Sequence, residues 1–219
     1  MAFDVPSRRE ALALADRLPG LRWAKIGPVL FVGEGPALVR DFAARGVQVF
    51  LDLKWHDIPS TVAGAVAAAR DLGVAMATVH CLGGERMLAA ARAEAGDLAL
   101  VGVTVLTSHD APEFGRVVGR GVPDLGVEVE RLARLAVGAA LRGIVASGQE
   151  VSLLRGALGP DPWIVVPGVR LAGDGRDDQV RTVTPAQARQ RGATHLVVGR
   201  PITHATDPAA VFGRVMEDA

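Results

Sequence analysis

Residues 47–60 of the chain read Val47-Gln48-Val49-Phe50-Leu51-Asp52-Leu53-Lys54-Trp55-His56-Asp57-Ile58-Pro59-Ser60. The first half of this stretch is an apolar run with the composition of a strand. Pro59 and Ser60 then open a segment of helical composition, because Pro suits the first turn of a helix and Ser caps one. A strand followed directly by a helix is the unit from which parallel sheets are built.

The same alternation extends along the whole sequence. Short apolar runs predict strands at residues 1–3, 23–26, 47–53, 76–80, 98–105, 143–146, 163–166 and 195–198. Helical composition is found between them, at residues 7–18, 36–45, 60–72, 85–94, 127–141 and 185–191. Eight units averaging about 27 residues are enough for a compact barrel. We therefore predict one α/β domain over residues 1–219, a (β/α)8 TIM barrel.

An open doubly wound sheet is the competing architecture. A dinucleotide-binding fingerprint would favour it, but the nearest candidate, Gly33-Glu34-Gly35-Pro36, lacks the third glycine and holds a proline in the turn. The barrel is therefore preferred. We expect the polar stretches at 107–124 and 170–182 to be loops over a site.

Composition excludes several classes of protein. The formal net charge is zero and 49% of the residues are hydrophobic, so nothing indicates a nucleic-acid surface or an anionic-membrane partner. The single cysteine, Cys81, cannot form an internal disulfide and suits a reducing compartment. Asp4 lies where a signal peptide would be basic or apolar, and no apolar run reaches the ~20 residues of a membrane helix. We expect a soluble, cytoplasmic protein.

Lysine occurs only at Lys25 and Lys54, and arginine supplies the other cationic side chains apart from histidine. An ammonium can release its proton at a working pH, whereas a guanidinium stays charged. A bias of composition could leave two lysines anywhere in the chain. Both lysines, however, lie at the ends of strand-like runs, so we interpret them as candidates for chemistry.

Asp52 and Lys54 share a face of the quoted strand, because alternate residues of a strand point the same way. Leu51 and Leu53 must then face the helices, which places Phe50, Asp52 and Lys54 on the inner face of the barrel. Two residues of strand rise by about 6.6 Å, so the two charged side chains can touch. Burying unpaired charges costs several kcal/mol. We therefore favour a functional array over a structural ion pair that closes the barrel mouth.

Two residues that follow the array are harder to assign. Asp57 lies beyond the strand, where periodicity gives it no face, and on local evidence it is a candidate N-cap for the helix near Pro59. His56 flanks the array, and we expect it to stay uninvolved in proton transfer. His109, His195 and His204 show no metal-ligand spacing. His80 and Cys81 are adjacent, and we favour a packed role for them over a metal-binding pair.

Two turns near the end of the chain predict a phosphate site. They read Pro167-Gly168-Val169-Arg170 and Gly199-Arg200-Pro201-Ile202, and they follow the last two predicted strands. Barrels often bind phosphate in these loops, where glycine allows close backbone approach and arginine binds phosphate oxygens in pairs. Residues 171–179 between them are polar and glycine-rich, which is typical of a lid as well as of an ordinary flexible loop.

Taken together, these residues resemble the orotidine 5′-phosphate decarboxylase family. The Asp-x-Lys-x-x-Asp run of Asp52, Lys54 and Asp57, continued by residues 58–61, is similar to the family signature. Further similarities lie, in the family's order, at residues 3–7, Lys25, residues 103–108, residues 167–170 with Gln179, and residues 199–202. The resemblance covers essentially the whole chain.

This resemblance implies that orotidine 5′-monophosphate is converted to UMP and carbon dioxide, in the last step of de novo UMP biosynthesis, without a metal or an organic cofactor. It implies that Lys54 protonates C6 of the pyrimidine and that Asp52 faces the substrate carboxylate. It also implies a homodimer, in which Asp57 and Thr61, with Ile58 beside them, reach the partner's site.

The remaining binding residues are implied by the same resemblance. Asp4 and Lys25 would hold the ribose hydroxyls, and either Thr107 or Ser108 would contact the pyrimidine. The residues expected at the phosphate end are Pro167, Arg170, Gln179, Gly199 and Arg200.

Two alternatives remain open from the sequence. A related barrel with the same array decarboxylates or condenses sugar phosphates with Mg²⁺, but it would need a carboxylate where this chain has Lys25. A phosphate-binding barrel without catalytic activity would keep the Gly/Arg turns, but it need not keep Lys54 between two acids.

Overall fold

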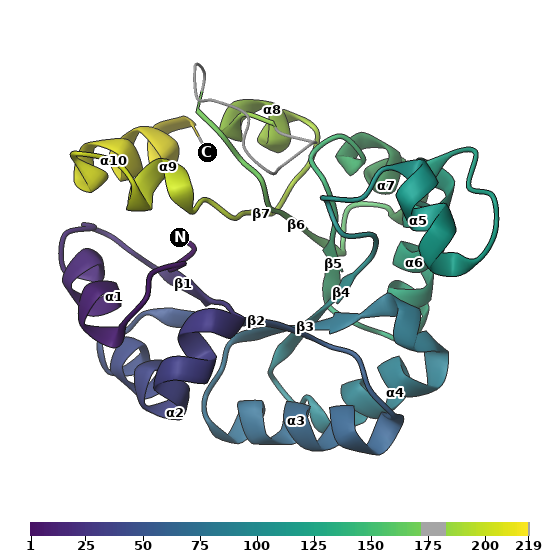
Figure 1. Ribbon diagram of the computed structural model, residues 1–219, viewed down its shortest axis with the longest axis horizontal. Coiled ribbons are helices and arrows are strands. Elements are labelled where there is room, and N and C mark those ends of the chain that lie inside the picture. Colours follow the sequence, from purple (N-terminus) through teal and green to yellow (C-terminus); the bar gives the residue numbers. More distant parts are fainter. Residues whose placement is uncertain (172–182, 219) are drawn as a thin grey trace.

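The computed structural model describes residues 1–171 and 183–218. Seven parallel strands form one curled sheet in sequential order, with the helices around its outside (Figure 1). The strands are β1 (Trp23–Ile26), β2 (Gln48–Trp55), β3 (Met76–His80), β4 (Ala99–Val103), β5 (Gly143–Val145), β6 (Trp163–Val166) and β7 (His195–Leu196). Each overlaps one of the strands that the sequence predicts after residue 20, so the alternation of apolar runs and helices is confirmed.

Residues 1–3, the remaining predicted strand, form only an isolated parallel bridge between Ala2 and Lys25. The Ala2 amide donates to the Val198 carbonyl at 2.7 Å, and the Phe3 amide donates to the Lys25 carbonyl at 3.0 Å. The N-terminal segment therefore lies between β1 and the residues that follow β7, where the first strand of the predicted barrel would lie.

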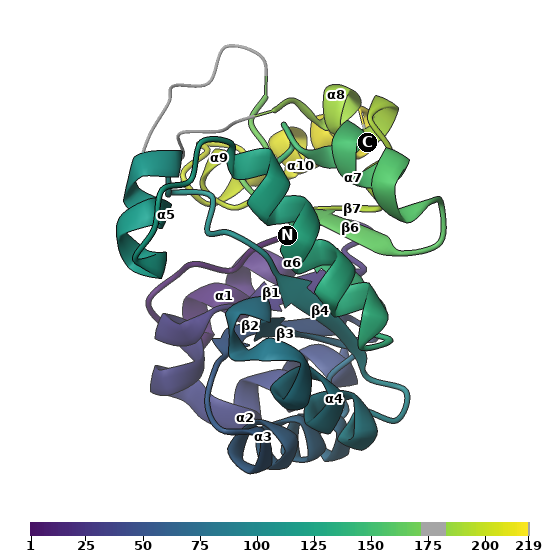
Figure 2. The same ribbon diagram turned by 90° about the vertical axis from the view of Figure 1, so that its right-hand side faces the viewer.

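Each of the six helical segments that the sequence predicts overlaps a helix of the structure, and the described residues contain four further helices. The helices are α1 (Arg8–Ala15), α2 (Pro28–Ala44), α3 (Pro59–Asp71), α4 (Gly84–Glu94), α5 (Ala111–Val118), α6 (Leu125–Gly138), α7 (Val151–Leu158), α8 (Pro185–Gln190), α9 (Arg200–Thr203) and α10 (Pro208–Asp218), with a 3-10 turn, η1, at Cys81–Gly83. Ser7 caps α1 and Thr184 caps α8 through side-chain hydrogen bonds to backbone amides. Figures 1 and 2 both show α2, α3 and α4 along the outer face of β1–β4.

Two expectations about loops and helix starts are wrong. The stretch 107–124 is not a continuous loop, because it contains α5, which Asp110 caps and which buries Phe114 against the body of the protein. Helix α2 begins at Pro28 rather than at Pro36, and Gly35, with φ of 60°, kinks it. Most of the second expected loop, 170–182, falls outside the described residues.

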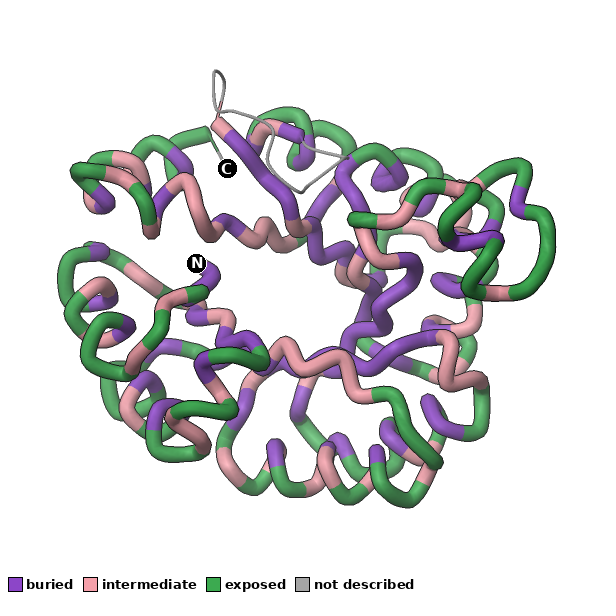
Figure 3. Tube along the Cα trace, in the orientation of Figure 1, coloured by how far each residue is buried: buried purple, intermediate pink, exposed green. Residues whose placement is uncertain are grey.

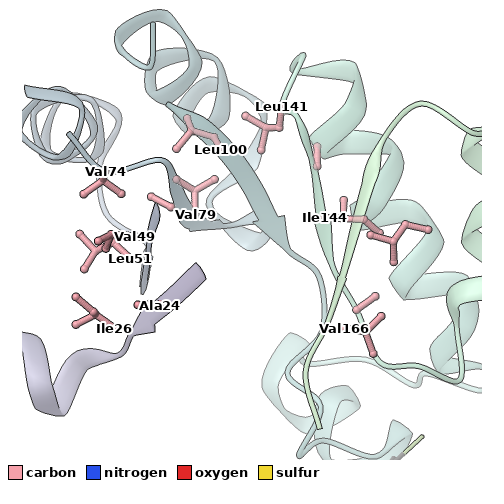
Figure 4. Close-up of a cluster of buried hydrophobic side chains, with 14 of the residues drawn as sticks. Ala24, Ile26, Val49, Leu51, Val74, Val79, Leu100, Leu141, Ile144 and Val166 are labelled. Atoms are coloured by element: carbon pink, nitrogen blue, oxygen red, sulfur yellow. The ribbon is translucent and has the colours of Figure 1, made fainter. Parts of the chain in front are cut away.

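The core has two layers, one on each face of the sheet. The inner layer is the cluster of Phe50, Met76, Val101 and Val165. The outer layer packs the strands against the helices, and its members in Figure 4 include Ala24, Ile26, Val49, Leu51, Val79, Leu100, Ile144 and Val166. The strands are accordingly mostly buried while the helices keep an exposed side (Figure 3). Burial on both faces fixes the register of each strand, since a shift by one residue would exchange the two layers.

Candidate active site

Four charged side chains from neighbouring segments form an alternating array. Lys54 Nζ lies 2.9 Å from Asp52 Oδ1, so the two side chains of β2 pair as predicted. Lys25 Nζ, on β1, lies 3.6 Å from Asp52 Oδ2. It also donates a hydrogen bond of 3.3 Å to Asp4 Oδ1, on the segment before α1. The two lysines of the chain therefore share one carboxylate.

The faces of β2 are those that the alternation of its residues predicts. Phe50, Asp52 and Lys54 line one pocket, on the inner side of the sheet. Leu51 and Leu53 instead line a hollow on the outer side, with residues of α2 and α3. The placement of Asp52 and Lys54 on the inner face is thus confirmed.

The Asp52 carboxylate is held in its charged form. Burial by itself would raise the pKa of this carboxyl group. The positive charges of Lys54 and then Lys25, with hydrogen bonds from Lys54 and from the Thr78 hydroxyl, outweigh burial and lower the pKa below its usual value. Asp52 is therefore ionised at neutral pH and keeps both ammonium groups close together.

The backbone at Lys54 departs from regular strand geometry. Lys54 has φ of 51°, in the left-handed region that non-glycine residues adopt at a cost of roughly 1–2 kcal/mol. The register between β2 and β3 also shifts here, from Leu51 opposite Ala77 to Trp55 opposite Val79. Three residues of β2 therefore face one residue of β3, and the bulge re-aims the Lys54 side chain.

A pocket of about 400 Å³ contains the array. It opens where the strands end, on the same side as the turns after β6 and β7. The predicted site residues that line it are Asp4, Lys25, Asp52, Lys54, Thr107, Ser108, Pro167, Arg170, Gly199 and Arg200. The structure thus brings together residues that are nearly 200 positions apart in the sequence.

The two Gly/Arg turns lie in this same pocket. Gly168 has φ of 72°, which favours glycine over other residues. At Gly199 a Cβ atom would lie 3.3 Å from Asp4 Oδ2, so glycine allows the turn to approach the N-terminal segment closely. Arg170 is buried, and Arg200 is the first residue of α9. The pocket therefore has a carboxylate–lysine array and an arginine-containing end.

Three predicted site residues do not line the pocket of their own chain. Asp57, Ile58 and Thr61 are exposed at the start of α3. Ile58, not Asp57, is the N-cap residue of α3, and Asp57 Oδ1 accepts a hydrogen bond from the Ile58 amide at 2.6 Å. The N-cap alternative for Asp57 is therefore wrong. Gln179 falls outside the described residues.

Thr78 and His80 belong to the surroundings of the array, and neither was among the predicted site residues. They share a face of β3 with Met76, a member of the inner layer. The Thr78 hydroxyl accepts a hydrogen bond from the Lys54 amide at 2.8 Å and donates one to Asp52 Oδ1 at 3.0 Å. Polar residues at alternate positions of an apolar strand are the sequence signal that would have found them.

His80 is kept neutral by its surroundings. Burial, the neighbouring His56, Lys54 and His109 together lower the pKa of His80 to about 4. The ring of His56 stacks on His80 at 5.4 Å between centroids. Cys81, the next residue, is buried, and burial raises the pKa of its thiol to about 12. Neither side chain has the proton affinity of an acid–base catalyst or a nucleophile at neutral pH.

A second cavity, of about 310 Å³, lies at the opposite end of the sheet. Trp23, Met76 and His195, the first residues of β1, β3 and β7, are among its lining residues. Its walls are mainly apolar, and it contains neither Asp52 nor the Gly/Arg turns. The charged pocket is therefore the candidate active site.

No group of three or more His, Cys, Asp or Glu side chains among residues 1–171 and 183–218 is arranged to hold a metal ion. Within the same ranges, no helix has both the length and the apolar character needed to cross a membrane.

Comparison with known proteins connects this site to a family. Residues 1–215 match the family model described as "Orotidine 5'-phosphate decarboxylase / HUMPS family". The chain is 47% identical to the orotidine 5'-phosphate decarboxylase of Nitrosospira multiformis, covering 100% of this chain and 92% of the relative. It is 49% identical to that of Alkalilimnicola ehrlichii, covering 98% and 93%.

A solved structure has the same fold. The crystal structure of orotidine 5'-phosphate decarboxylase from Lactobacillus acidophilus matches with a TM-score of 0.87 at 31% sequence identity. The match covers 99% of this chain and 96% of that chain. The similarity therefore extends over the pocket as well as over the sheet.

Proposed function

The chain belongs to the orotidine 5'-phosphate decarboxylase / HUMPS family, and from this premise we propose that it converts orotidine 5′-monophosphate to UMP and carbon dioxide. The observation that carries the proposal is the pocket itself, which holds the Asp52–Lys54 pair and both Gly/Arg turns in one space. Relatives that bear the decarboxylase name match the chain over nearly its full length. The activity is that of a carbon–carbon lyase in UMP biosynthesis.

The chemical step requires the site to stabilise a carbanion at C6 of the pyrimidine ring. The bond between C6 and the carboxylate breaks, carbon dioxide leaves, and the electron pair stays on C6 in the plane of the ring. Lys54 then donates a proton from its ammonium group to C6, and the amine recovers a proton from solvent. Fixed charges aimed at the developing anion are the strongest stabilising device available to such a site. The site residues proposed for this step are Lys54, Asp52 and Asp57.

Asp52 has two roles in this proposal. It faces the substrate carboxylate, and its Oδ1 holds the Lys54 ammonium at 2.9 Å. The lowered pKa of Asp52 supports both roles, because only the ionised carboxylate attracts Lys54 and repels the substrate carboxylate. Lys25 on its other side limits the energetic penalty of a charged acid in this position.

Binding of the ribose and phosphate supplies energy for the chemical step. Asp4 and Lys25 are proposed to hold the ribose hydroxyls, which their mutual hydrogen bond and position in the pocket support. Thr107 and Ser108 both line the pocket, so either hydroxyl is a candidate for the pyrimidine contact. The proposed residues of the phosphate end are Pro167, Arg170, Gln179, Gly199 and Arg200.

We also propose that the enzyme is a homodimer with shared sites. Asp57, Ile58 and Thr61 do not line the pocket of their own chain, which agrees with a role in the partner's pocket. Ile58 is 64% exposed, and the large apolar side chains Val29 and Val32 are exposed on α2, after the neighbouring strand. These side chains follow the carboxyl ends of β1 and β2, and an apolar patch at that end would suit an interface.

The proposal also covers the closure of the barrel, the extent of the domain, and the compartment and cofactors of the enzyme. Residues 1–3 would complete an eight-stranded (β/α)8 barrel, as the hydrogen bonds of Ala2 and Phe3 support. Residues 1–219 would form a single domain, since the family match runs from residue 1 to residue 215. The enzyme would work in the cytoplasm without a metal or an organic cofactor.

The decisive experiment follows the ultraviolet absorbance of orotidine 5′-monophosphate with purified protein in excess EDTA. Loss of the substrate spectrum with one equivalent of UMP is the expected result. Turnover of sugar phosphates only after Mg²⁺ is added would instead indicate the related barrel enzyme that acts on sugar phosphates. Binding of nucleotide without any turnover would indicate a sensor instead of an enzyme.

A further inference from the structure

Thr78 lies behind the charged array and outside the pocket. It is the middle residue of β3 and is fully buried, with 0% of its surface exposed. Thr78 is absent from the residues that line the pocket, so a bound substrate would not touch it. Any effect of Thr78 on the reaction must therefore act through its neighbours.

The position of Thr78 coincides with the irregularity of β2. Thr78 is the one β3 residue between the pairs Leu51–Ala77 and Trp55–Val79, opposite three residues of β2. The Lys54 amide, which regular pairing would direct to a β3 carbonyl, donates instead to the Thr78 hydroxyl at 2.8 Å. This bond satisfies a backbone donor in the bulge and holds Lys54 in its left-handed conformation.

The same hydroxyl contacts the acid of the array. The Thr78 Oγ1 hydroxyl donates to Asp52 Oδ1, with 3.0 Å between the two oxygens, and the same carboxylate oxygen accepts from Lys54 Nζ at 2.9 Å. A hydroxyl can accept one bond while it donates another, and both are made here. Thr78 is thus connected to the backbone of Lys54 and to the side-chain partner of Lys54.

We propose that Thr78 is a positioning residue, whose hydroxyl fixes the Lys54 backbone and the Asp52 carboxylate so that the Lys54 ammonium is directed into the pocket. This inference rests on the proposed function, because it gives Thr78 a role in the step that Lys54 performs. The hydroxyl replaces a strand-pairing partner and at the same time orients the acid, which a valine of the same shape cannot do.

The test compares three variants. Thr78→Val removes the hydroxyl and keeps the shape, whereas Thr78→Ser keeps the hydroxyl. Thr104→Val is the matched control, because Thr104 is equally buried and its hydroxyl donates to the Val145 carbonyl at 3.0 Å, away from the array. For each variant, kcat and KM with orotidine 5′-monophosphate, the dissociation constant of UMP and the thermal unfolding midpoint are measured.

The expected result is a fall in kcat of about tenfold to a hundredfold for Thr78→Val, within the range of a lost positioning contact. KM and UMP binding should stay within about threefold, because the phosphate and ribose contacts are untouched. Thr78→Ser should recover most of kcat. An unchanged kcat in Thr78→Val, an equal fall in Thr104→Val, or a Thr78→Ser variant as slow as Thr78→Val would overturn the proposal.

A measurement on the unmodified protein tests the inference even if Thr78→Val does not fold. Amide hydrogen exchange of Lys54 should be slow, because the amide is bonded to a buried hydroxyl. Rapid exchange of this amide in the native protein would show that the Thr78 hydroxyl does not hold it, and would overturn the proposal. Failure of the native protein to decarboxylate orotidine 5′-monophosphate would instead overturn the proposed function, so the two failures are distinguished.

Discussion

Mixing two inactive variants should restore about a quarter of the native activity. The proposed site takes Lys54 from one subunit and Asp57 from the other, since Asp57 does not line the pocket of its own chain and is bonded to its own Ile58 amide. Lys54→Ala and Asp57→Ala homodimers each carry two damaged sites, and each should lose at least about a hundredfold in kcat.

The expected recovery follows from counting sites. When the two variants are unfolded together and refolded in equal amounts, about half of the dimers are hybrids. Each hybrid has one site with both damaged residues and one intact site, which gives about one quarter of the native sites. Activity is measured by the loss of orotidine 5′-monophosphate absorbance, with native protein taken through the same refolding.

A second mixture is the matched control. Asp52 and Lys54 pair within one chain at 2.9 Å, so a hybrid of Asp52→Ala and Lys54→Ala has no intact site and should recover nothing. Equal activity in both mixtures, or no recovery in the first mixture although hybrids are demonstrated by tags, would refute the shared site.

Three further changes test particular contacts. Lowering the pH from about 6.5 towards 4 should reduce the free energy of unfolding by up to about 1.4 kcal/mol per pH unit. The reason is that His80 binds a proton in the unfolded state over this range, whereas in the folded state its pKa is about 4 and it stays neutral. Urea unfolding at pH 7 and pH 5 should show a smaller loss for His80→Gln, and an identical loss would exclude His80 as the cause. Gly143→Ala should destabilise by about 1–3 kcal/mol, since its Cβ would lie 2.2 Å from the Trp163 carbonyl oxygen, whereas Gly64→Ala in the open should stabilise by about 0.4–1 kcal/mol. Thermal unfolding of the two alanine variants measures the difference, and equal midpoints would contradict the packing argument. Arg200→Ala should lower kcat/KM by about tenfold to a hundredfold, the value of a lost charge-assisted hydrogen bond to phosphate, and an unchanged kcat/KM would remove Arg200 from the phosphate site.

Much of the fold was predictable because its signals are local. Each strand is a short apolar run between helices, so seven of the eight predicted strands are found in the sheet. Helix α5 was missed because it has only eight residues and because glycine and proline interrupt the stretch in which it lies. Residues 1–3 form an isolated bridge but no regular strand. Amino-acid composition alone does not distinguish a short strand from a single bridge.

The charged array was predictable for a similar reason. Alternation along β2 is enough to place Asp52 and Lys54 on one face, and the structure pairs them. The left-handed conformation of Lys54 and its bond to Thr78 were not predictable, because they depend on a register shift between two strands. Contacts across strands become visible only when the register is known.

The central claim is that the Lys54 ammonium donates the proton that C6 receives, and the Lys54→Arg variant tests this claim most directly. Arginine keeps the positive charge but stays protonated, so kcat should fall by about 10²–10⁴-fold or more, while UMP binding stays close to native. Arg45→Lys, the reverse exchange at an exposed pair with Asp16, is the control and should leave kcat unchanged. A Lys54→Arg enzyme with native kcat would contradict the account, because a charge alone would then be sufficient.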